Sequence, residues 1–498
     1  MADAKKNVFD ELFVISDLHL GGEEEPTLFA AGSEFKNWMN RTVLPRCGDQ
    51  RHVGLVINGD MFDFLAERGA RYFDPLAARG AVSRIAADPR YKPVFDQLKT
   101  FLDRPNTRLA ITLGNHDLEL CDSGVRGAVE SVLKQTANSN SRIAWALESQ
   151  GYSCRVGSKR VLCRHGNEGD PDNQVHRERL DRALKTAGNP TKGVSWIPNT
   201  GTHIVIDIVN PLHEMFPFVQ VLKPEDHKLV LLVLIISPSQ LKRLPQVASV
   251  LYEALKARLG LLADALVDTS RKPRRRISRR EIQLLAQGLV LSSSTAAGAG
   301  SLQDTTELLR VAHEQVELTW REMERQRGRL AAGIVQEQPE SPWERWNRRR
   351  QRLAFYDAFK AAISLSDRTE ILRNYLKSTT PDRQFDERDR TDRVYQFFCH
   401  QPPPNVDYLL TGHTHHKRNN LPLGDNTRYF NTGTWARVMR IPQQVVTDPI
   451  QFCKLSCMLR QEHNKELFAN KQFVQSPCDY LHLHSNGSEV IAELKQAN

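Results

Sequence analysis

The sequence predicts an α/β protein with a mostly α-helical insertion, and two observations carry that prediction. Apolar runs typical of buried strands alternate with segments of helical spacing through about the first 200 residues. Five such runs end directly before a short polar cluster, at residues 12–15, 53–57, 109–113, 161–163 and 408–410. Because α/β folds bring the ends of neighbouring strands to one rim of a sheet, the five clusters should meet there.

Helical spacing fits the segments 32–44, 91–102, 128–133 and 144–147 within this first part. From about residue 200 the chain changes to long Arg- and Glu-rich segments with helical periodicity, at 240–267, 304–334 and 343–376. We therefore divide the chain into four parts. These are the first part of a core (1–200), a helical basic insertion (201–400), a return segment of the core (401–445) and a C-terminal extension (446–498).

The five polar clusters contain residue types that hold divalent metal ions. They are Asp17-Leu18-His19, Gly59-Asp60-Met61-Phe62-Asp63, Gly114-Asn115-His116-Asp117, His165-Gly166-Asn167-Glu168 and Gly412-His413-Thr414-His415. Imidazole, carboxylate and amide groups together suit borderline metals such as Mn²⁺, Fe²⁺ or Zn²⁺. Residues i and i+2 share one side of an extended chain, so Asp17 and His19 should point the same way, as should His413 and His415.

In this order the clusters resemble the signature of the calcineurin-like metallophosphoesterase superfamily: DxH, GDxxD, GNH[DE], a single His, and GHxH. The resemblance covers about the first 200 residues and a return segment near 405–440. It implies a β-sandwich flanked by helices, with two divalent metal ions, Mn²⁺ foremost, that hold a bridging hydroxide for phosphoester hydrolysis. The implied metal ligands are Asp17, His19, Asp60 (bridging), Asn115, His165, His413 and His415.

The same resemblance implies that His116 binds no metal but protonates the leaving oxygen, and that Asp63 orients it. Asp117 is expected to cap the following helix. The fourth cluster continues to Asn173 like the extended loop of some bacterial phosphoesterases. Its Asn167, Asp172 and Asn173 either contact substrate or form turns, and His416 either contacts substrate phosphates or is solvated.

The net charge of +9 is concentrated in two basic clusters of the insertion. Residues 271–280 hold seven basic side chains and no acid, among them Arg274, Arg275 and Arg276, and a second cluster holds Arg348, Arg349 and Arg350. Such clusters fit phosphate-rich partners such as DNA or RNA. A solvated helix face or a docking surface for an acidic partner explains them equally well.

Three functions compete on these grounds. The first, which we expect, is a phosphodiesterase acting on nucleic acid or a nucleotide. The second is a pyrophosphatase on a nucleotide-linked lipid or small molecule, because segments 13–20 and 59–64 resemble UDP-2,3-diacylglucosamine pyrophosphatases, although those enzymes carry Arg where His116 stands. The third is a metallophosphoesterase subunit of a nucleic-acid-processing or defence assembly.

The eight cysteines lack the spacing of a secreted disulfide framework. Cys453, Cys457 and Cys478, with His482 and His484, offer ligands for a structural zinc, but residues 480–484 fit a strand with one polar face equally well. The longest apolar run, at 229–236, is far below the ~20 residues of a membrane helix. We expect a cytoplasmic protein with no transmembrane segment, whose long helices allow a homo-oligomer or a complex.

Overall fold

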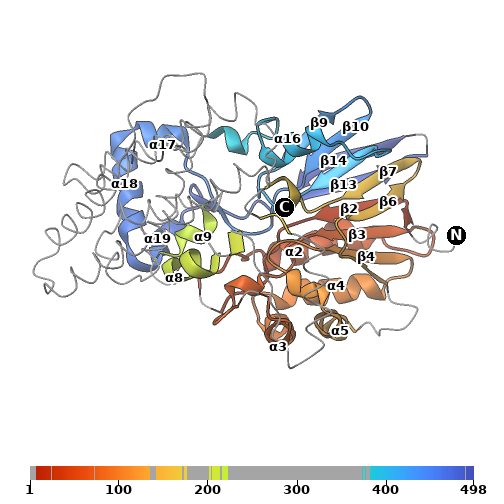
Figure 1. Cartoon of the computed structure of the whole chain (residues 1–498), viewed down its shortest axis with the longest axis horizontal. Helices are drawn as coiled ribbons and strands as arrows, with labels where there is room; N and C mark the ends of the chain where they lie inside the picture. The colour runs from red at the N-terminus through yellow and green to blue at the C-terminus, as the bar shows by residue number, and fades with distance from the viewer. Residues whose placement is uncertain are drawn as a thin grey trace, which may run out of the picture.

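The computed structural model describes residues 7–23, 25–71, 73–134, 142–170, 173–175, 201–202, 205–213, 216–222, 373, 376, 382–487 and 489–497. In this part of the chain the protein is a mixed α/β fold built on two six-stranded sheets (Figure 1). Both sheets mix parallel and antiparallel pairing. The α/β fold class predicted from the sequence is confirmed at this level.

The first sheet has the strand order β14-β13-β2-β3-β4-β5. Strands β2 to β5 are parallel to one another, whereas β13 pairs antiparallel with both β2 and β14. The C-terminal segment therefore supplies two strands to the sheet that the N-terminal segment begins. The bounds are β2 Glu11–Ile15, β3 Val53–Asn58, β4 Thr107–Thr112, β5 Ile143–Ala146, β13 Asp479–Ser485 and β14 Val490–Gln496.

The second sheet has the order β1-β6-β7-β8-β10-β9. It packs face to face with the first sheet through an apolar layer that includes Leu12, Val56, Cys163, Leu410 and Leu481. Burial of this layer drives the association of the two sheets. The bounds are β1 Val8–Phe9, β6 Tyr152–Val156, β7 Lys159–Cys163, β8 Tyr408–Thr411, β9 Arg418–Leu423 and β10 Thr427–Asn431.

Helices cover the outer faces of both sheets (Figure 1). Those on the first sheet are α2 Gly32–Trp38, α3 Pro75–Ala87, α4 Lys92–Asp103 and α5 Ser123–Val132, and α16 Arg393–His400 packs on the second. The side chains of Asp74, Asp122 and Asp392 accept backbone N–H bonds at the starts of α3, α5 and α16, which explains where these helices begin. The described part of the chain thus forms four layers, with the two sheets inside.

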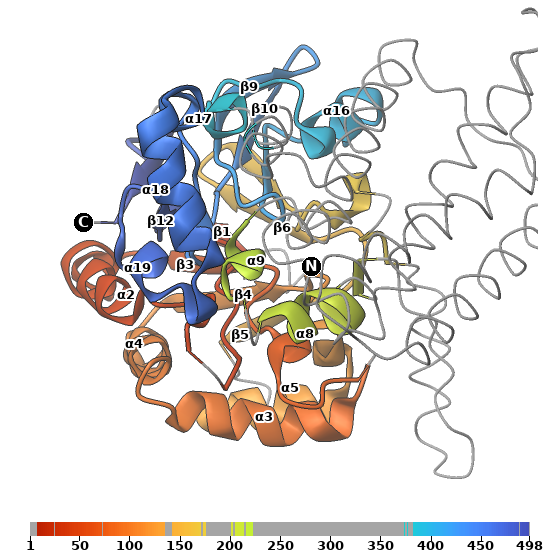
Figure 2. The ribbon, with the colours of Figure 1, turned by 90° about the vertical axis from the view of Figure 1, so that its left-hand side faces the viewer.

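Helix α9 lies beside α18 and α19 of the segment that precedes β13 (Figure 2), and a smaller apolar core joins this segment to residues 205–222. It is formed by η6 Val205–Val209, α8 Asn210–His213, α9 Phe218–Val221, β11 Val438–Met439, α17 Gln443–Thr447, α18 Pro449–Arg460, α19 Lys465–Ala469 and β12 Val474–Gln475. The remaining short helices are η1 Met39–Val43, η2 Leu44–Arg46, η3 Phe64–Ala66, η4 Leu118–Cys121, η5 Asn167–Gly169, η8 Asp382–Phe385 and η9 Glu462–Asn464.

All five strands predicted before the polar clusters are present, as β2, β3, β4, β7 and β8. The helices predicted at 32–44, 91–102 and 128–133 are also confirmed, as α2 with η1, α4 and the end of α5. The helix predicted at 144–147 is wrong, because Ile143–Ala146 is β5 and pairs with β4. A run of four apolar residues is too short for its spacing to distinguish a strand from a helix.

Most of the predicted insertion lies outside the described residues. This applies to the helices predicted at 240–267, 304–334 and 343–376, apart from Arg373 and Leu376, and to both basic clusters. Asp172 also lies outside. Among the helices that the structure does describe, we find none with the length and apolarity needed to cross a membrane.

Candidate metal centre

The polar clusters meet at one rim of the two sheets, as the sequence predicts. Asp17, Asp60 and Asn115 follow the C-terminal ends of the parallel strands β2, β3 and β4 in the first sheet. His165 follows β7, and the segment with His413 and His415 follows β8, which is parallel to β7 in the second sheet. The cluster therefore depends on the packing of one sheet against the other.

Five of these side chains project from strained backbone. Asp17, His19, Asp60, His413 and His415 all have positive φ angles, between 49° and 68°. The backbone at these residues is therefore left-handed, and the extended chain that we predicted as the reason for their shared direction is wrong. Non-glycine residues adopt this left-handed conformation at a cost of about 1–3 kcal/mol each, and such strain is concentrated at functional sites.

The glycines of the clusters leave room for the neighbouring polar side chains. A Cβ atom on Gly114 would lie 1.9 Å from Oδ1 of Asp60, and one on Gly59 would lie 2.2 Å from Nδ1 of His165. A Cβ atom on Gly412 would lie 2.3 Å from Oδ2 of Asp17. Each glycine is therefore required by close approach to a candidate ligand from a different cluster.

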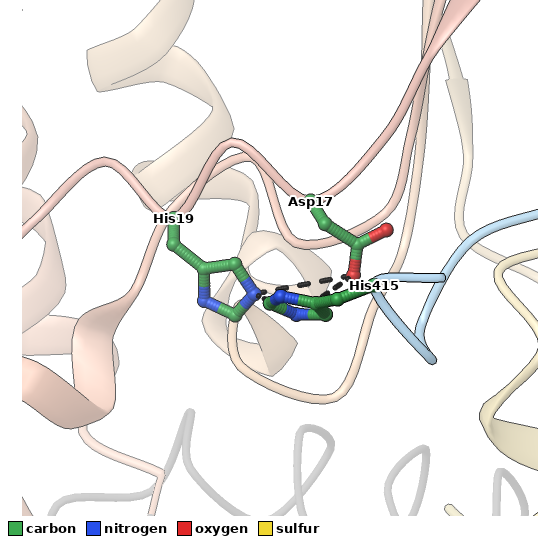
Figure 3. Close-up of side chains that lie close together, drawn as sticks. All are labelled: Asp17, His19 and His415. Atoms are coloured by element: carbon green, nitrogen blue, oxygen red, sulfur yellow. Dashed lines mark hydrogen bonds and ion pairs between the residues drawn. The ribbon is translucent and has the colours of Figure 1, made fainter. Parts of the chain in front are cut away.

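Asp17, His19 and His415 form the first group of candidate ligands (Figure 3). The Nε2 atoms of the two histidines are 3.1 Å apart, and Oδ1 of Asp17 lies 3.4 Å from Nε2 of His415 and 3.9 Å from Nε2 of His19. Nδ1 of His19 contacts Asp63 at 3.1 Å. Because a carboxylate accepts, His19 carries its proton on Nδ1 and presents the lone pair of Nε2 to the group.

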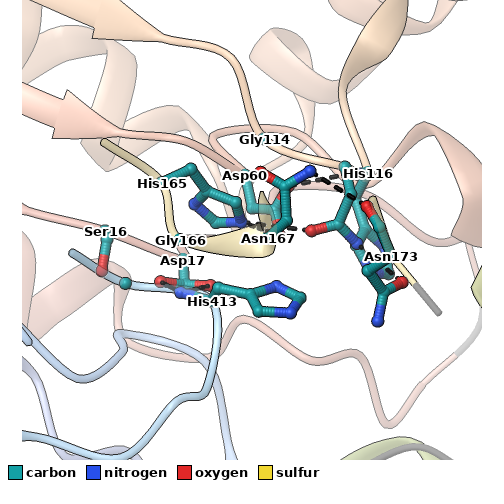
Figure 4. Close-up of polar contacts among 12 residues, drawn as sticks. Ser16, Asp17, Asp60, Gly114, His116, His165, Gly166, Asn167, Asn173 and His413 are labelled. Carbon is teal, nitrogen blue, oxygen red and sulfur yellow. Dashed lines mark hydrogen bonds and ion pairs between the residues drawn. The ribbon is translucent and has the colours of Figure 1, made fainter. Parts of the chain in front are cut away.

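Asp60, His165 and His413 form a second group (Figure 4). Nδ1 of His165 lies 2.9 Å from the carbonyl oxygen of Asn58, which can only accept, so Nδ1 carries the proton. Nε2 of His165 faces two further oxygens, Oδ2 of Asp60 at 3.1 Å and Oδ1 of Asn115 at 3.2 Å. A nitrogen lone pair surrounded by acceptor oxygens fits a cation.

Asp63 connects His19 to His116. Its Oδ1 lies 3.1 Å from Nδ1 of His116 and also accepts from the backbone N–H of Ala66, while its Oδ2 accepts from His19. The predicted Asp63–His116 pair is therefore present, but its link to His19 is an addition that the sequence did not suggest. The His116 ring packs edge-on against His19, with 4.7 Å between the ring centroids.

The charges of the cluster favour a bound cation. Burial opposes the charge on His165, but the carboxylates of Asp60 and Asp17 outweigh it and raise the pKa of the imidazole to about 10. Burial also opposes the charges of Asp60 and Asp63. Neighbouring histidines nevertheless hold the pKa of each carboxyl well below its usual range. His165 has the largest such effect on Asp60, and His116 has the largest on Asp63. A metal ion can replace these protons, because imidazole binds metal in its neutral form.

The donor set therefore fits a bound metal ion. Asp60 belongs both to the group with His165 and His413 and to a group with His19 and His116. The side chains of Asp17, His19, Asp60, Asn115, His116, His165 and His415 are almost completely buried, so oxygen and nitrogen ligands converge in a space largely closed to bulk water. In this environment they can hold metal at fixed positions.

Asp170 is a site residue that the sequence analysis missed. Its Oδ2 lies 3.1 Å from Nε2 of His413, and although burial opposes its charge, the contact with His413 lowers the pKa of the carboxyl to about 2. The same oxygen accepts from the side chain of Asn173 at 2.8 Å. The available signal was the acid five residues after His165 in the fourth cluster.

The residues predicted to contact substrate have other partners. Asn167 donates to the backbone carbonyl of Asn173 at 3.0 Å (Figure 4). Asn115 donates to the Asn173 side chain at 3.4 Å. These bonds close the loop after β7, in agreement with the predicted turns. His416 is buried and packs edge-on against Phe385 at 4.8 Å, so the alternative of a solvated His416 is wrong.

Asp117 does not cap the following short helix. Its side chain accepts instead from the backbone N–H groups of Met61 and Gly114, both at 2.8 Å, and makes no capping bond to η4. Burial, and then the charge of Asp60, raise the pKa of the Asp117 carboxyl to about 7. The Asp117 side chain therefore links the backbone of the second cluster to that of the third.

The end of β10 and the segment that follows it contact the first and the last of the polar clusters. Thr434 donates through its hydroxyl to the carbonyl of Asp17 at 2.8 Å, and the Asn431 side chain donates to the carbonyl of Gly412 at 2.7 Å.

Comparison with known proteins gives no relative from which to transfer a function. No protein-family model matches the chain, and neither the curated proteins nor the solved structures provide a match. The function must therefore be argued from the residues of the site.

Proposed function

We propose that the protein is a metallophosphoesterase that uses two divalent metal ions, with Mn²⁺ as the preferred metal, to hydrolyse phosphodiesters. One observation carries the proposal: Asp60 is shared between two groups of candidate ligands, beside a histidine paired with a buried aspartate. Two packed sheets with helices on both outer faces also agree with the layers that the resemblance implies.

In this proposal Asp17, His19 and His415 would hold one ion, His165, His413 and Asn115 would hold the other, and Asp60 would serve as a ligand for both. Bound ions would offset the negative charge of the phosphate and activate a water molecule at neutral pH. Asp63 and the Asn58 carbonyl each hold a proton on Nδ1 of a histidine, so Nε2 is the nitrogen of His19 and of His165 that is left to bind metal.

His116 acts as the general acid. Its Nδ1–H donates to Asp63 at 3.1 Å, so the proton for the leaving oxygen is held at Nε2. The negative charge of Asp63 favours the protonated imidazole that this step needs and keeps the ring oriented. His116 also lies within ligand distance of His19 and Asp60, so the metal content of a His116 variant is the decisive measurement.

The test is Mn²⁺-dependent hydrolysis of bis-p-nitrophenyl phosphate, compared with p-nitrophenyl phosphate and with labelled single- and double-stranded DNA. His116→Ala should keep its metal and lose about 10²–10⁴-fold in turnover. Asp60→Ala should lose both metal and turnover. Loss of metal in His116→Ala would overturn the assignment of its role, and metal-independent hydrolysis would overturn the proposal.

The DNA substrates divide the functions that the sequence left open. Cleavage of DNA, lost in Asp60→Ala, supports a nuclease whose basic clusters at 271–280 and 348–350 bind the substrate. Diester hydrolysis without DNA cleavage supports a small nucleotide or lipid-linked substrate. A full-length chain that binds Mn²⁺ but hydrolyses none of these substrates contradicts the proposal and favours a subunit of a larger assembly.

A further inference from the structure

The fold separates the cysteines near the C-terminus from the two histidines with which the sequence grouped them. Cys453 and Cys457 are exposed on α18, whereas Cys478 is buried in the core beneath the first sheet. Among the described residues, none of the three joins a group of candidate metal ligands with His482 or His484. The two histidines meet a carboxylate instead.

His482, His484 and Glu493 form this group on β13 and on β14, the strand at one edge of the first sheet. His482 and Glu493 lie directly opposite each other in the antiparallel pair of β13 and β14, and His484 follows two residues later on the same side of β13. One ligand atom from each of the three residues lies within 4.8 Å of the others, and Nε2 of His484 lies 3.5 Å from Oε2 of Glu493.

Glu11, on the neighbouring strand β2, orients His482. Its Oε2 lies 2.9 Å from Nε2 of His482, and Arg46 and Arg51 hold the same carboxylate at 2.9 and 3.0 Å. A carboxylate accepts, so Nε2 carries the proton and Nδ1 carries the lone pair. Proteins commonly orient metal-binding histidines by such a carboxylate contact on the opposite nitrogen.

The position of the His482 ring is fixed further by Phe13. The two rings are stacked, with 4.4 Å between centroids and an angle of 2° between planes. His482 is almost fully buried, whereas the side chains of His484 and Glu493 are 26% and 40% exposed. The His482 ring is therefore held in place by its neighbours, whereas His484 and Glu493 are accessible from solvent.

We propose that His482, His484 and Glu493 bind one Zn²⁺ ion, at a site separate from the candidate metal centre. Two imidazoles and one carboxylate, with a water molecule as the fourth ligand, match the donor types and the number of ligands that zinc takes in open tetrahedral sites. The ion would join β14, the last strand of the sheet, to β13 and so stabilise the folded chain that binds it.

Lys495 competes with the ion for Glu493. Its Nζ lies 2.7 Å from Oε2 of Glu493, and this lysine is 43% exposed. An exposed pair of this kind contributes little to stability, so an ion can displace the ammonium group. The competition provides a variant whose effect has the opposite sign to the loss of a ligand.

The experiment measures Zn²⁺ bound per chain by equilibrium dialysis of the full-length, metal-stripped protein over a range of free Zn²⁺. We expect His484→Gln to bind one Zn²⁺ fewer than wild type, and Glu11→Gln to bind at this site about 10- to 100-fold more weakly. Lys495→Met should bind it several-fold more tightly. Hydrolysis with Mn²⁺ serves as the separate readout of the candidate metal centre, and it should be the same in all four proteins.

Equal Zn²⁺ counts in wild type and His484→Gln at every concentration would overturn the proposal. So would unchanged affinity in Lys495→Met, a variant that leaves every proposed ligand in place. Melting temperatures in a chelator check that the variants fold, and the Zn²⁺-dependent rise in melting temperature should be smaller in His484→Gln than in wild type. Because the readout is metal bound rather than activity, the result stands whether or not the chain hydrolyses phosphodiesters.

Discussion

Asp63→Asn should weaken metal binding more than it weakens proton transfer. Oδ1 of Asp63 accepts from two donors, the backbone N–H of Ala66 and Nδ1 of His116, whereas Oδ2 accepts from His19 alone. Asparagine has one oxygen, which we expect on the side with two donors. Its NH₂ group then faces Nδ1 of His19, which must become the acceptor and move its proton to Nε2, the nitrogen proposed to bind metal.

The size of the effect follows from the bond that is lost. A hydrogen bond to a charged group contributes about 1.5–3 kcal/mol, which corresponds to about 10- to 150-fold in metal affinity. At saturating metal, Asp63→Asn should retain more turnover than His116→Ala, because His116 keeps an acceptor. Asp63→Ala should lose both properties, because neither histidine then keeps its partner.

The assay is the Mn²⁺ dependence of bis-p-nitrophenyl phosphate hydrolysis, with bound Mn²⁺ measured in parallel. Wild-type metal affinity in Asp63→Asn would refute the argument about the His19 tautomer. Turnover at saturating metal as low as that of His116→Ala would refute the argument that the amide oxygen stays with His116.

Three further predictions concern packing, orientation and charge. Gly114→Ala should abolish Mn²⁺ binding, because its Cβ atom would overlap a candidate carboxylate ligand. The control is Gly127→Ala on α5, where a Cβ atom meets nothing within 4 Å. This control should bind Mn²⁺ normally, and its folded state should be stabilised by up to about 1 kcal/mol. Asp170→Asn should reduce Mn²⁺ affinity about 10- to 100-fold by releasing His413, and unchanged affinity by calorimetry would contradict that role. Burial raises the pKa of the Asp479 carboxyl to about 6, so the folded chain binds this proton more tightly than the unfolded one. The free energy of unfolding should therefore fall by up to about 3 kcal/mol as pH rises from about 4 to about 6, and denaturant titrations should show a smaller fall in Asp479→Asn.

The candidate ligands could be predicted because their signal is local. Each cluster follows a short apolar run, and the end of a buried strand is recognisable from a few neighbouring residues. Where the local signal was weaker, prediction failed: residues 143–146 form an edge strand, and Asp117 bonds to two loops rather than to its own helix. Both outcomes depend on partners elsewhere in the chain.

The order of residues along the chain is enough to show which residue types follow which strands, and hence the chemistry that the rim of the sheets can support. Which atoms face one another became known only when the packing of the two sheets was seen. Asp63 lies between His19 and His116, Asp170 reaches His413 across 243 positions, and Glu493 joins two histidines that the sequence had grouped with cysteines. The reason is physical: hydrogen bonds and metal ligation act over about 3 Å in space, and distance along the chain carries no information about them until the sheets have packed.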